Sequence, residues 1–268
     1  MATDVDLTSL LSESELNVHG RLVDSSNNAL VVEIATGSDS TPVIAVYKPA
    51  AGERPLWDFP DTALARREVA AYTLSQQLGW DIVPQTVWRE QGPAGPGMCQ
   101  LWIDTEPTDS YINLFAAQDV PATWQQILEG RDEHDRPVVL AHSDDDALRR
   151  LAVFDVIANN ADRKAGHLLL SSAHPNRHLW AIDHGLTFHT EPKLRTVIWG
   201  FAGEKLPQWL QDDLGAFIRE IDRHSAALGL NLSAAEVDAT FERASTLLDS
   251  GEFPRPSGDG PAVPWPVY

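Results

Sequence analysis

The sequence predicts an α+β protein whose N-terminal part is mainly antiparallel strands and whose remainder is mainly helical. β-branched and apolar runs separated by turn clusters fill residues 16–49, a pattern typical of adjacent antiparallel strands. An apolar period of helical type follows at 61–79, and strand-like runs return at 85–89 and 98–103. With 268 residues, of which 43% are hydrophobic, the chain can bury one large core or form two small lobes.

The first strand region is expected to be a meander of three antiparallel strands. Polar turn clusters at 24–28 and 36–41 separate its apolar runs. Residues 1–15 precede it as a frayed segment or a short helix, and 50–60, with three charged residues and two prolines, are expected as a loop. The strands themselves are expected at 19–23, 29–34 and 42–47.

A helix is expected over 61–79. Asp61 or Thr62 can cap its start, and Gly79 stops it. A Gly/Pro turn at 92–97 then joins the two strands that follow. The apolar face of the helix includes Leu64, Val69, Tyr72, Leu74 and Leu78.

After residue 107 helices are expected to dominate. A weakly helical stretch at 124–128 is followed by a charged loop at 129–137. Two short strands, at 167–170 and 178–182, are expected to form a hairpin. The last fifteen residues hold five prolines and are expected to run as an extended tail. The well-marked helices are expected at 144–157, 208–224 and 234–248.

Composition excludes several classes of function. The formal charge of −19 disfavours broad nucleic-acid binding, which needs a basic surface to neutralise phosphates. No apolar run is long enough for a transmembrane helix or a signal peptide, so no membrane span is expected. The single cysteine, Cys99, can form neither an intrachain disulfide nor a cysteine metal cluster. A reducing cytoplasm is therefore the expected location.

A lysine at the end of a strand is the first candidate for chemistry. Lys48 ends the third strand run, and Glu68 follows it by twenty residues in the expected helix. A glutamate on a neighbouring helix can fix the rotamer of a strand lysine, which then serves as a point charge on phosphate groups. Lys48 can equally be a solvated residue at a strand edge.

Two polar turns supply the other candidates. Residues 159–163, Asn-Asn-Ala-Asp-Arg, directly follow a helix, and Asp183 leaves the last strand of the expected hairpin. Each could be an ordinary turn. The hairpin between them would, however, return Asp162 and Asp183 to one edge. Phosphoryl transfer needs a carboxylate for the acceptor, a carboxylate for a divalent metal and a cation on phosphate, which Asp162, Asp183 and Lys48 could supply.

In this order the motifs resemble those of the phosphatidylinositol 3-/4-kinase-like family, a branch of the kinase fold that also includes HipA-type serine kinases. The small actinobacterial members look most similar. Residues 45–49, Ala-Val-Tyr-Lys-Pro, are similar to the ATP-lysine strand of type II phosphatidylinositol 4-kinases. The resemblance spans roughly residues 18–206. Its other segments are 67–72 and 83–86 for the helix and next strand, 155–163 for the catalytic loop, and 182–185 for the metal loop.

The resemblance implies a bilobed protein-kinase-like fold that binds ATP with Mg²⁺ or Mn²⁺ between the lobes. The antiparallel-sheet N-lobe would be residues 1–103, the mainly helical C-lobe 104–253, and the proline-rich tail 254–268. Catalysis would involve Asp162 and Arg163. The metal would be held by Asp183, with His167 or Asn160. The nucleotide would contact Lys48 and its partner Glu68, a phosphate loop containing Ser25, Ser26 and Asn27, and a lobe-linking segment made of Gln100, Leu101, Trp102 and Ile103.

Two departures from the family pattern bear on activity. His167 stands where the family usually carries an asparagine that binds a second metal, and histidine suits Mn²⁺ better than Mg²⁺. A packed histidine at the start of a strand is the alternative interpretation. The phosphate loop at 24–28 contains no glycine, and Asp24 would repel phosphates.

The sequence therefore indicates a kinase that transfers phosphate from ATP to a hydroxyl acceptor, which could be a small molecule, a lipid headgroup or a protein serine. Nucleotidyl transfer is a related activity that the residues do not exclude. A pseudokinase that binds nucleotide without turnover is the competing hypothesis, and its support is His167 and the glycine-free loop. A structural domain without this chemistry is the third alternative.

Overall fold

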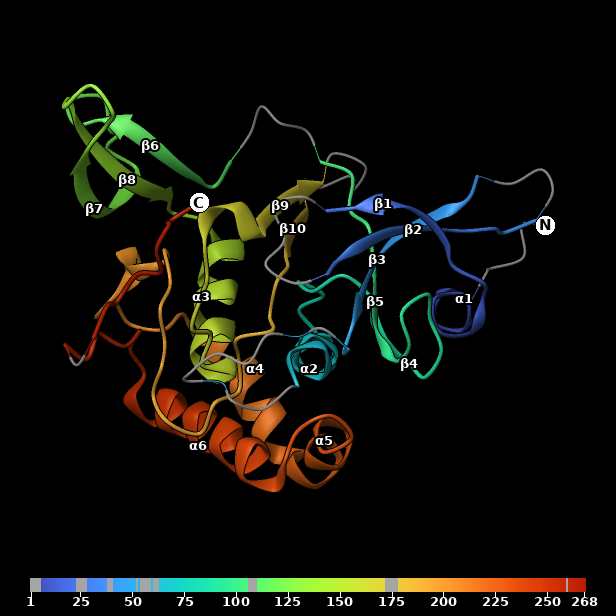
Figure 1. Cartoon of the computed structure of the whole chain (residues 1–268). Helices are drawn as coiled ribbons and strands as arrows, with labels where there is room; N and C mark the ends of the chain where they lie inside the picture. Colours follow the sequence, from blue (N-terminus) through green and yellow to red (C-terminus); the bar gives the residue numbers. More distant parts are fainter. Residues whose placement is uncertain are drawn as a thin grey trace.

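Figure 1 shows the computed structural model, in which a sheet-rich N-terminal part lies beside a C-terminal part dominated by helices. This arrangement confirms the predicted α+β class with antiparallel sheets. We use N-lobe for residues 1–103 and C-lobe for residues 104–253. The structure describes residues 6–22, 28–37, 41–51, 53, 59, 63–105, 110–171, 178–258 and 260–268.

One five-stranded antiparallel sheet forms the base of the N-lobe, in the order β1-β2-β3-β5-β4. Burial alternates along β3, so that Ala45 and Tyr47 join Leu11 of α1 (Leu7–Glu13) in one apolar cluster. Lys48 therefore projects from the other face of the sheet. The strands are β1 (Asn17–Arg21), β2 (Leu30–Ile34), β3 (Val43–Pro49), β4 (Thr86–Arg89) and β5 (Gly97–Leu101).

Helix α2 (Leu64–Gln77) begins without a cap from its own preceding residue. The two predicted capping residues, Asp61 and Thr62, lie outside the described residues. Instead, the carboxylate of Glu53 accepts hydrogen bonds from the backbone amides of Leu64 and Ala65, at 3.1 and 2.8 Å. A carboxylate at this position also interacts favourably with the positive end of the helix dipole.

The C-lobe contains the predicted helices and the predicted hairpin. Helix α3 (Asp146–Ala158) is capped by Asp145, whose side chain accepts from the amide of Ala147, and it ends at Asn159 in the left-handed conformation. Strands β9 (Leu168–Ser171) and β10 (His178–Ala181) then pair antiparallel. The remaining elements are η1 (Ala165–His167), η2 (Trp199–Phe201), α4 (Gln208–Arg219), α5 (Ile221–Leu228) and α6 (Ala234–Ser250).

The helix predicted at 124–128 was wrong, whereas the charged loop predicted at 129–137 is confirmed for its central part. Residues 124–131 form a strand of a three-stranded antiparallel sheet in the order β6-β8-β7, and residues 132–136 connect that strand to the next one. The pairing register shifts between Gln126 and Leu128, where the sequence has two adjacent apolar residues, Ile127 and Leu128, and this interrupts the two-residue alternation of a strand. The strands are β6 (Ile112–Ala116), β7 (Trp124–Arg131) and β8 (Pro137–Ser143).

Two further expectations are refined. The helix expected over 208–224 is divided into α4 and α5 at Glu220, where no glycine or proline signals a break. The last residues do run without helix or strand, but they are docked rather than loose. The carbonyl of Val267 accepts from the amide of Ala165 at 2.8 Å, and the carbonyl of Ala262 accepts from Trp199 Nε1 at 2.7 Å.

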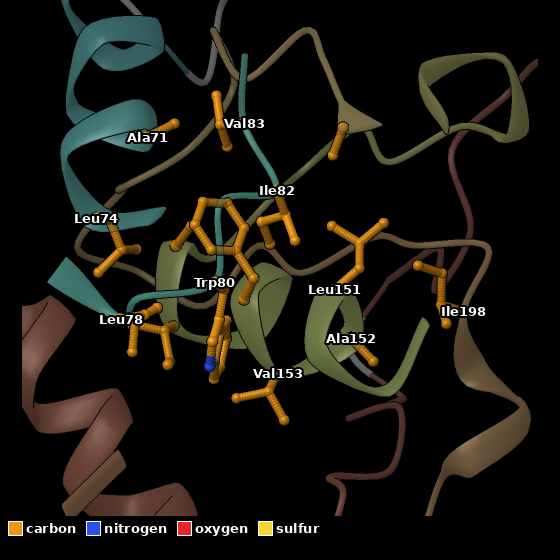
Figure 2. Close-up of a cluster of buried hydrophobic side chains, with 14 of the residues drawn as sticks. Ala71, Leu74, Leu78, Trp80, Ile82, Val83, Leu151, Ala152, Val153 and Ile198 are labelled. Carbon is orange, nitrogen blue, oxygen red and sulfur yellow. The ribbon is translucent and has the colours of Figure 1, made fainter. Parts of the chain in front are cut away.

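One large hydrophobic core connects the two lobes. Figure 2 shows side chains of α2, of the segment after it and of α3 packed together. Trp80 and Ile82, which directly follow α2, are 7% and 3% exposed within this cluster. Helix α2 is therefore packed against the C-lobe as well as against its own sheet. The labelled members are Ala71, Leu74, Leu78, Trp80, Ile82, Val83, Leu151, Ala152, Val153 and Ile198.

Candidate active site

The predicted contact between Lys48 and Glu68 is present. Lys48 Nζ donates to Glu68 Oε1 at 2.6 Å, and the second oxygen of Glu68 accepts from the backbone amide of His184 at 2.8 Å. Burial lowers the pKa of Lys48, but the carboxylates of Asp183 and Glu68 outweigh burial and raise it above its ordinary value. Burial raises the pKa of Glu68, and Lys48 opposes this shift. The amine at this position is therefore a fixed positive charge.

Asp183 shares the same lysine. Its Oδ1 lies 2.9 Å from Lys48 Nζ, and Lys48 holds the pKa of Asp183 well below its usual range. The backbone of Asp183 has φ of 60°, a left-handed conformation that non-glycine residues adopt mainly where the surroundings impose it. Its side chain is 46% exposed, so its carboxylate is accessible while its backbone is strained.

His167 lies against the other oxygen of the same carboxylate. Its Nε2 is 3.4 Å from Asp183 Oδ2. The hairpin creates this proximity, because Leu168 pairs with Ala181 and the amide of Ile182 donates to the carbonyl of His167 at 3.0 Å. Burial lowers the pKa of His167 to about 4, so the imidazole is neutral at neutral pH.

Asp162 is the partly exposed carboxylate of the loop after α3. Its Oδ2 lies 3.1 Å from Lys164 Nζ, and the two side chains are 25% and 21% exposed. Burial raises the pKa of Asp162, Lys164 lowers it, and Asp183 is near enough to raise it again. The loop is tied to the segment after Asp183, because the amide of Ala161 donates to the carbonyl of Leu186 at 2.8 Å.

Two residues predicted for chemistry are instead buried supports. The guanidinium of Arg163 is fully buried against Asp155, so it does not face the cleft as a catalytic group would. The amide of Asn160 is also fully buried: its Nδ2 donates to Asp155 and its Oδ1 accepts from the amide of Asp162. Since both ends of that side chain are engaged, Asn160 is a poor candidate for a metal ligand. We therefore propose positioning roles for these two residues in place of the predicted catalytic and metal-binding roles.

The segment predicted to contact adenine, residues 100–103, begins with the last two residues of β5. Gln100 is buried and donates to Thr86, so its side chain belongs to the sheet. The amides of Leu101 and Trp102 are also used in the sheet, by the carbonyls of residues 85 and 44. Ile103 is the first residue of this segment whose backbone makes no hydrogen bond to the part of the chain that the structure describes. The predicted phosphate-loop residues Ser25, Ser26 and Asn27 lie outside the described residues.

Four residues of this cluster were not predicted individually from the sequence. Glu53 and Lys164 are single charges in loops, and Asp155 and His184 read as parts of a helix and a turn. Glu53 lines a small cavity together with Lys48 and Glu68, so it lies next to that ion pair. In the sequence, the only signal for Asp155 and His184 was their place inside the two motifs. In the structure, Arg163 contacts both of them.

The overall fold is of the kinase-like α+β class. The solved structure of hydra Fam20 with sugar matches 93% of this chain and 89% of its own, with a TM-score of 0.55 and 12% identity. The crystal structure of the Helicobacter pylori proinflammatory kinase CtkA matches 91% of this chain and 94% of its own, with a TM-score of 0.46 and 10% identity. No helix within the described ranges is long and apolar enough to cross a bilayer.

The sequence also has a relative among curated proteins. It is 42% identical over 279 residues to Protein Rv2133c of Mycobacterium tuberculosis, a match that covers 98% of this chain and 96% of the relative. The chain therefore belongs to the same family as Protein Rv2133c. No family model matches the sequence.

Proposed function

We propose that this protein is an ATP-dependent phosphotransferase of the phosphatidylinositol 3-/4-kinase-like group, which moves the γ-phosphate of ATP to a hydroxyl acceptor. The observation that carries the proposal is the position of Lys48 Nζ, 2.6 Å from Glu68 and 2.9 Å from Asp183. A lysine fixed by a helix glutamate beside an accessible aspartate is the arrangement with which protein kinases position the phosphates and the metal.

In this proposal the nucleotide lies between the lobes. Lys48 contacts its phosphates, and Glu68 keeps the lysine in place. The backbone of Ile103 offers hydrogen bonds to adenine, because the amides before it are used in the sheet. Residues 25–27 stay a predicted phosphate loop.

The donor atoms present fit a divalent metal. His167 Nε2 and Asp183 Oδ2 are 3.4 Å apart, close to the roughly 3 Å that separates neighbouring ligands of an octahedral ion at about 2.1 Å. Two protein ligands leave the other positions for phosphate oxygens and water, as is usual for Mg²⁺ sites with nucleotides. A neutral imidazole favours Mn²⁺ over Mg²⁺. The metal, when bound, would neutralise charge that develops on the phosphates.

Asp162 is the group that orients the acceptor. Its carboxylate can accept the proton of the acceptor hydroxyl while the acceptor oxygen bonds to the γ-phosphorus and ADP leaves. Lys164 Nζ lies 3.1 Å from that carboxylate, and its positive charge favours the ionised form of Asp162. Arg163 and Asn160 support this loop from within the core.

Titration calorimetry tests the nucleotide site. ATP binding that requires Mg²⁺ or Mn²⁺ and is lost in Asp183→Ala is expected. The absence of ATP binding with either metal would overturn the proposal for this chain alone.

A pseudokinase is the second candidate, and the histidine at position 167 is the observation that favours it. Asp162→Asn separates the two functions. An enzyme would lose turnover of ATP while keeping nucleotide affinity, whereas a pseudokinase would show no turnover in the unchanged protein. The acceptor class, the cytoplasmic location and the absence of a nucleic-acid partner stay predictions from the sequence.

A further inference from the structure

A buried ion pair joins α2 to the C-lobe one residue away from Glu68. Arg67 is 3% exposed, and its Nη2 donates to Oε1 of Glu236 in the first turn of α6, at 2.7 Å. The guanidinium also lies over the ring of Phe59, 4.9 Å from its centroid. Among the described residues Glu236 is the one hydrogen-bond acceptor for this guanidinium, since Nε and Nη1 are buried without partners there. Among the described residues Glu236 is therefore the group that compensates the buried charge of Arg67.

Glu236 is held in place by its own helix. Its Oε2 accepts from the amide and the hydroxyl of Ser233, at 2.9 and 2.8 Å, in a capping box. One carboxylate oxygen thus accepts hydrogen bonds from Ser233 at the start of α6, and the other accepts from Arg67. A carboxylate fixed in this way is a rigid anchor for α2.

Other contacts hold the same helix against the C-lobe. Arg66 Nη1 donates to Asn231 at 3.3 Å, and Gln77 Nε2 donates to the carbonyl of His224 at 3.1 Å. Just beyond the helix, Trp80 Nε1 donates to Asp213 at 2.7 Å. Helix α2 is therefore attached to α4, to α5 and to the region around the start of α6, in addition to the shared core.

We propose that the Arg67–Glu236 pair is a clamp that positions Glu68 for Lys48, so that the nucleotide cleft is assembled without an activating partner. The inference rests on the proposed function. Neighbouring residues on a helix point about 100° apart. Arg67 therefore faces the C-lobe while Glu68 faces Lys48. A rotation or outward shift of α2 that withdrew Glu68 would also break the buried pair and leave two uncompensated charges, which is strongly unfavourable.

Hydrogen exchange and nucleotide affinity together test the clamp. Arg67→Met and Glu236→Ala are expected to speed exchange of the amides at 64–71 about tenfold and to weaken ATP affinity about tenfold. Glu236→Gln keeps the capping box and should show smaller effects of the same direction. It replaces Glu236→Ala if that variant fails to fold. Arg223→Ala, which breaks the exposed pair of Arg223 in α5 with Glu220 just before that helix, at 2.8 Å, is the matched control and should change neither quantity.

A second background distinguishes positioning from general stability. In Glu68→Ala, which removes the group that holds Lys48, adding Arg67→Met should weaken ATP affinity no further, because the clamp acts through Glu68. Unchanged exchange at 64–71 in Arg67→Met, or a full additional loss of affinity in the Glu68→Ala background, would overturn the clamp. The exchange measurement needs no nucleotide. If the unchanged protein does not bind ATP, the proposed function fails while the clamp is still tested.

Discussion

Arg163 and Asp155 form a fully buried ion pair, with Arg163 Nη2 3.0 Å from Asp155 Oδ1 and Nε 3.0 Å from Oδ2. The same guanidinium donates to the carbonyl of Ile182 at 2.9 Å and lies 2.7 Å from His184 Nε2. One side chain therefore links α3, the loop of Asp162 and the segment of Asp183. The two candidate carboxylates are positioned relative to each other through this buried cation.

Removal of this cation should be costly for stability. We expect Arg163→Met to lower the free energy of unfolding by about 3 kcal/mol or more, because Asp155 is left as an uncompensated buried charge. The double variant Arg163→Met/Asp155→Leu should recover part of that loss, since it removes the unpaired carboxylate. Urea unfolding at neutral pH measures both. Equal stability of the single variant and the unchanged protein would contradict a structural role for the pair.

Lys48→Met should weaken metal-dependent ATP binding by at least about tenfold, which corresponds to the loss of one charge-assisted contact with phosphate. Glu68→Gln should have a smaller effect, because an amide oxygen can still accept from Lys48. Calorimetric titration with each metal measures both variants. An ordering in which Glu68→Gln is the more damaging change would show that the lysine does not contact the nucleotide.

His167→Asn should change metal preference. An amide oxygen is a harder ligand than imidazole, so the ratio of ATP affinity with Mn²⁺ to that with Mg²⁺ should fall several-fold in the variant. His178→Asn serves as the control, because His178 lies at the end of β10 away from Asp183 and its imidazole contacts the carbonyl of Asp81. If His167→Asn leaves the ratio unchanged, the histidine is a packed residue rather than a ligand.

Buried His142 should make the protein sensitive to acid. Burial lowers the pKa of His142, and its Nε2 accepts from the amide of Gly200 at 3.0 Å, so the native state requires a neutral ring. The unfolded chain binds the proton below about pH 6.5, and stability therefore falls as pH decreases through that value. His142→Gln should cost about 1 kcal/mol at pH 7 and show a shallower loss in acid. Chemical unfolding at several pH values measures this slope. An identical slope in the variant would assign acid sensitivity to other groups, such as His184, whose pKa burial also lowers.

The parts of the fold that follow a regular period could be predicted from the sequence. The strands of the N-lobe, helix α3 and the β9–β10 hairpin follow from local apolar patterns and turn residues. Lys48, Glu68 and Asp183 were also predictable as a group, because each stands at the end or on one face of such an element. The structure brings their side chains within hydrogen-bonding distance.

The rest depends on packing, which local pattern does not encode. The bulge in β7 disguised a strand, and the break at Glu220 has no sequence signal. Arg163 and Asn160 have residue types typical of active sites, and the sequence does not reveal that both side chains are buried against Asp155. Glu53 caps a helix whose first residue lies eleven positions later, a relationship that only the folded chain reveals.

Buried Cys99 should make the protein less stable at alkaline pH. The thiol is completely buried in β5, and burial raises its pKa to about 12. In the unfolded chain a cysteine loses its proton near pH 8.5. Between these values the folded state binds more protons than the unfolded state, so stability falls as pH rises. For this one group the loss amounts to about 2 kcal/mol between pH 8 and pH 10.

Replacement of this thiol isolates its contribution. Cys99→Ala should lower stability at pH 7 by about 1 kcal/mol, because the smaller side chain leaves a gap between β3 and β4. Its stability should then decline less steeply above pH 8 than that of the unchanged protein. Urea unfolding from pH 7 to pH 10 measures the difference, and the reaction of the native thiol with an alkylating reagent provides an independent check. Because a thiolate can form only when β5 opens, labelling should be slow and should accelerate with urea in parallel with unfolding. Rapid labelling of the native protein at pH 8 would show that the sheet opens locally around Cys99, which is incompatible with a rigid β3–β5 pair beneath Lys48.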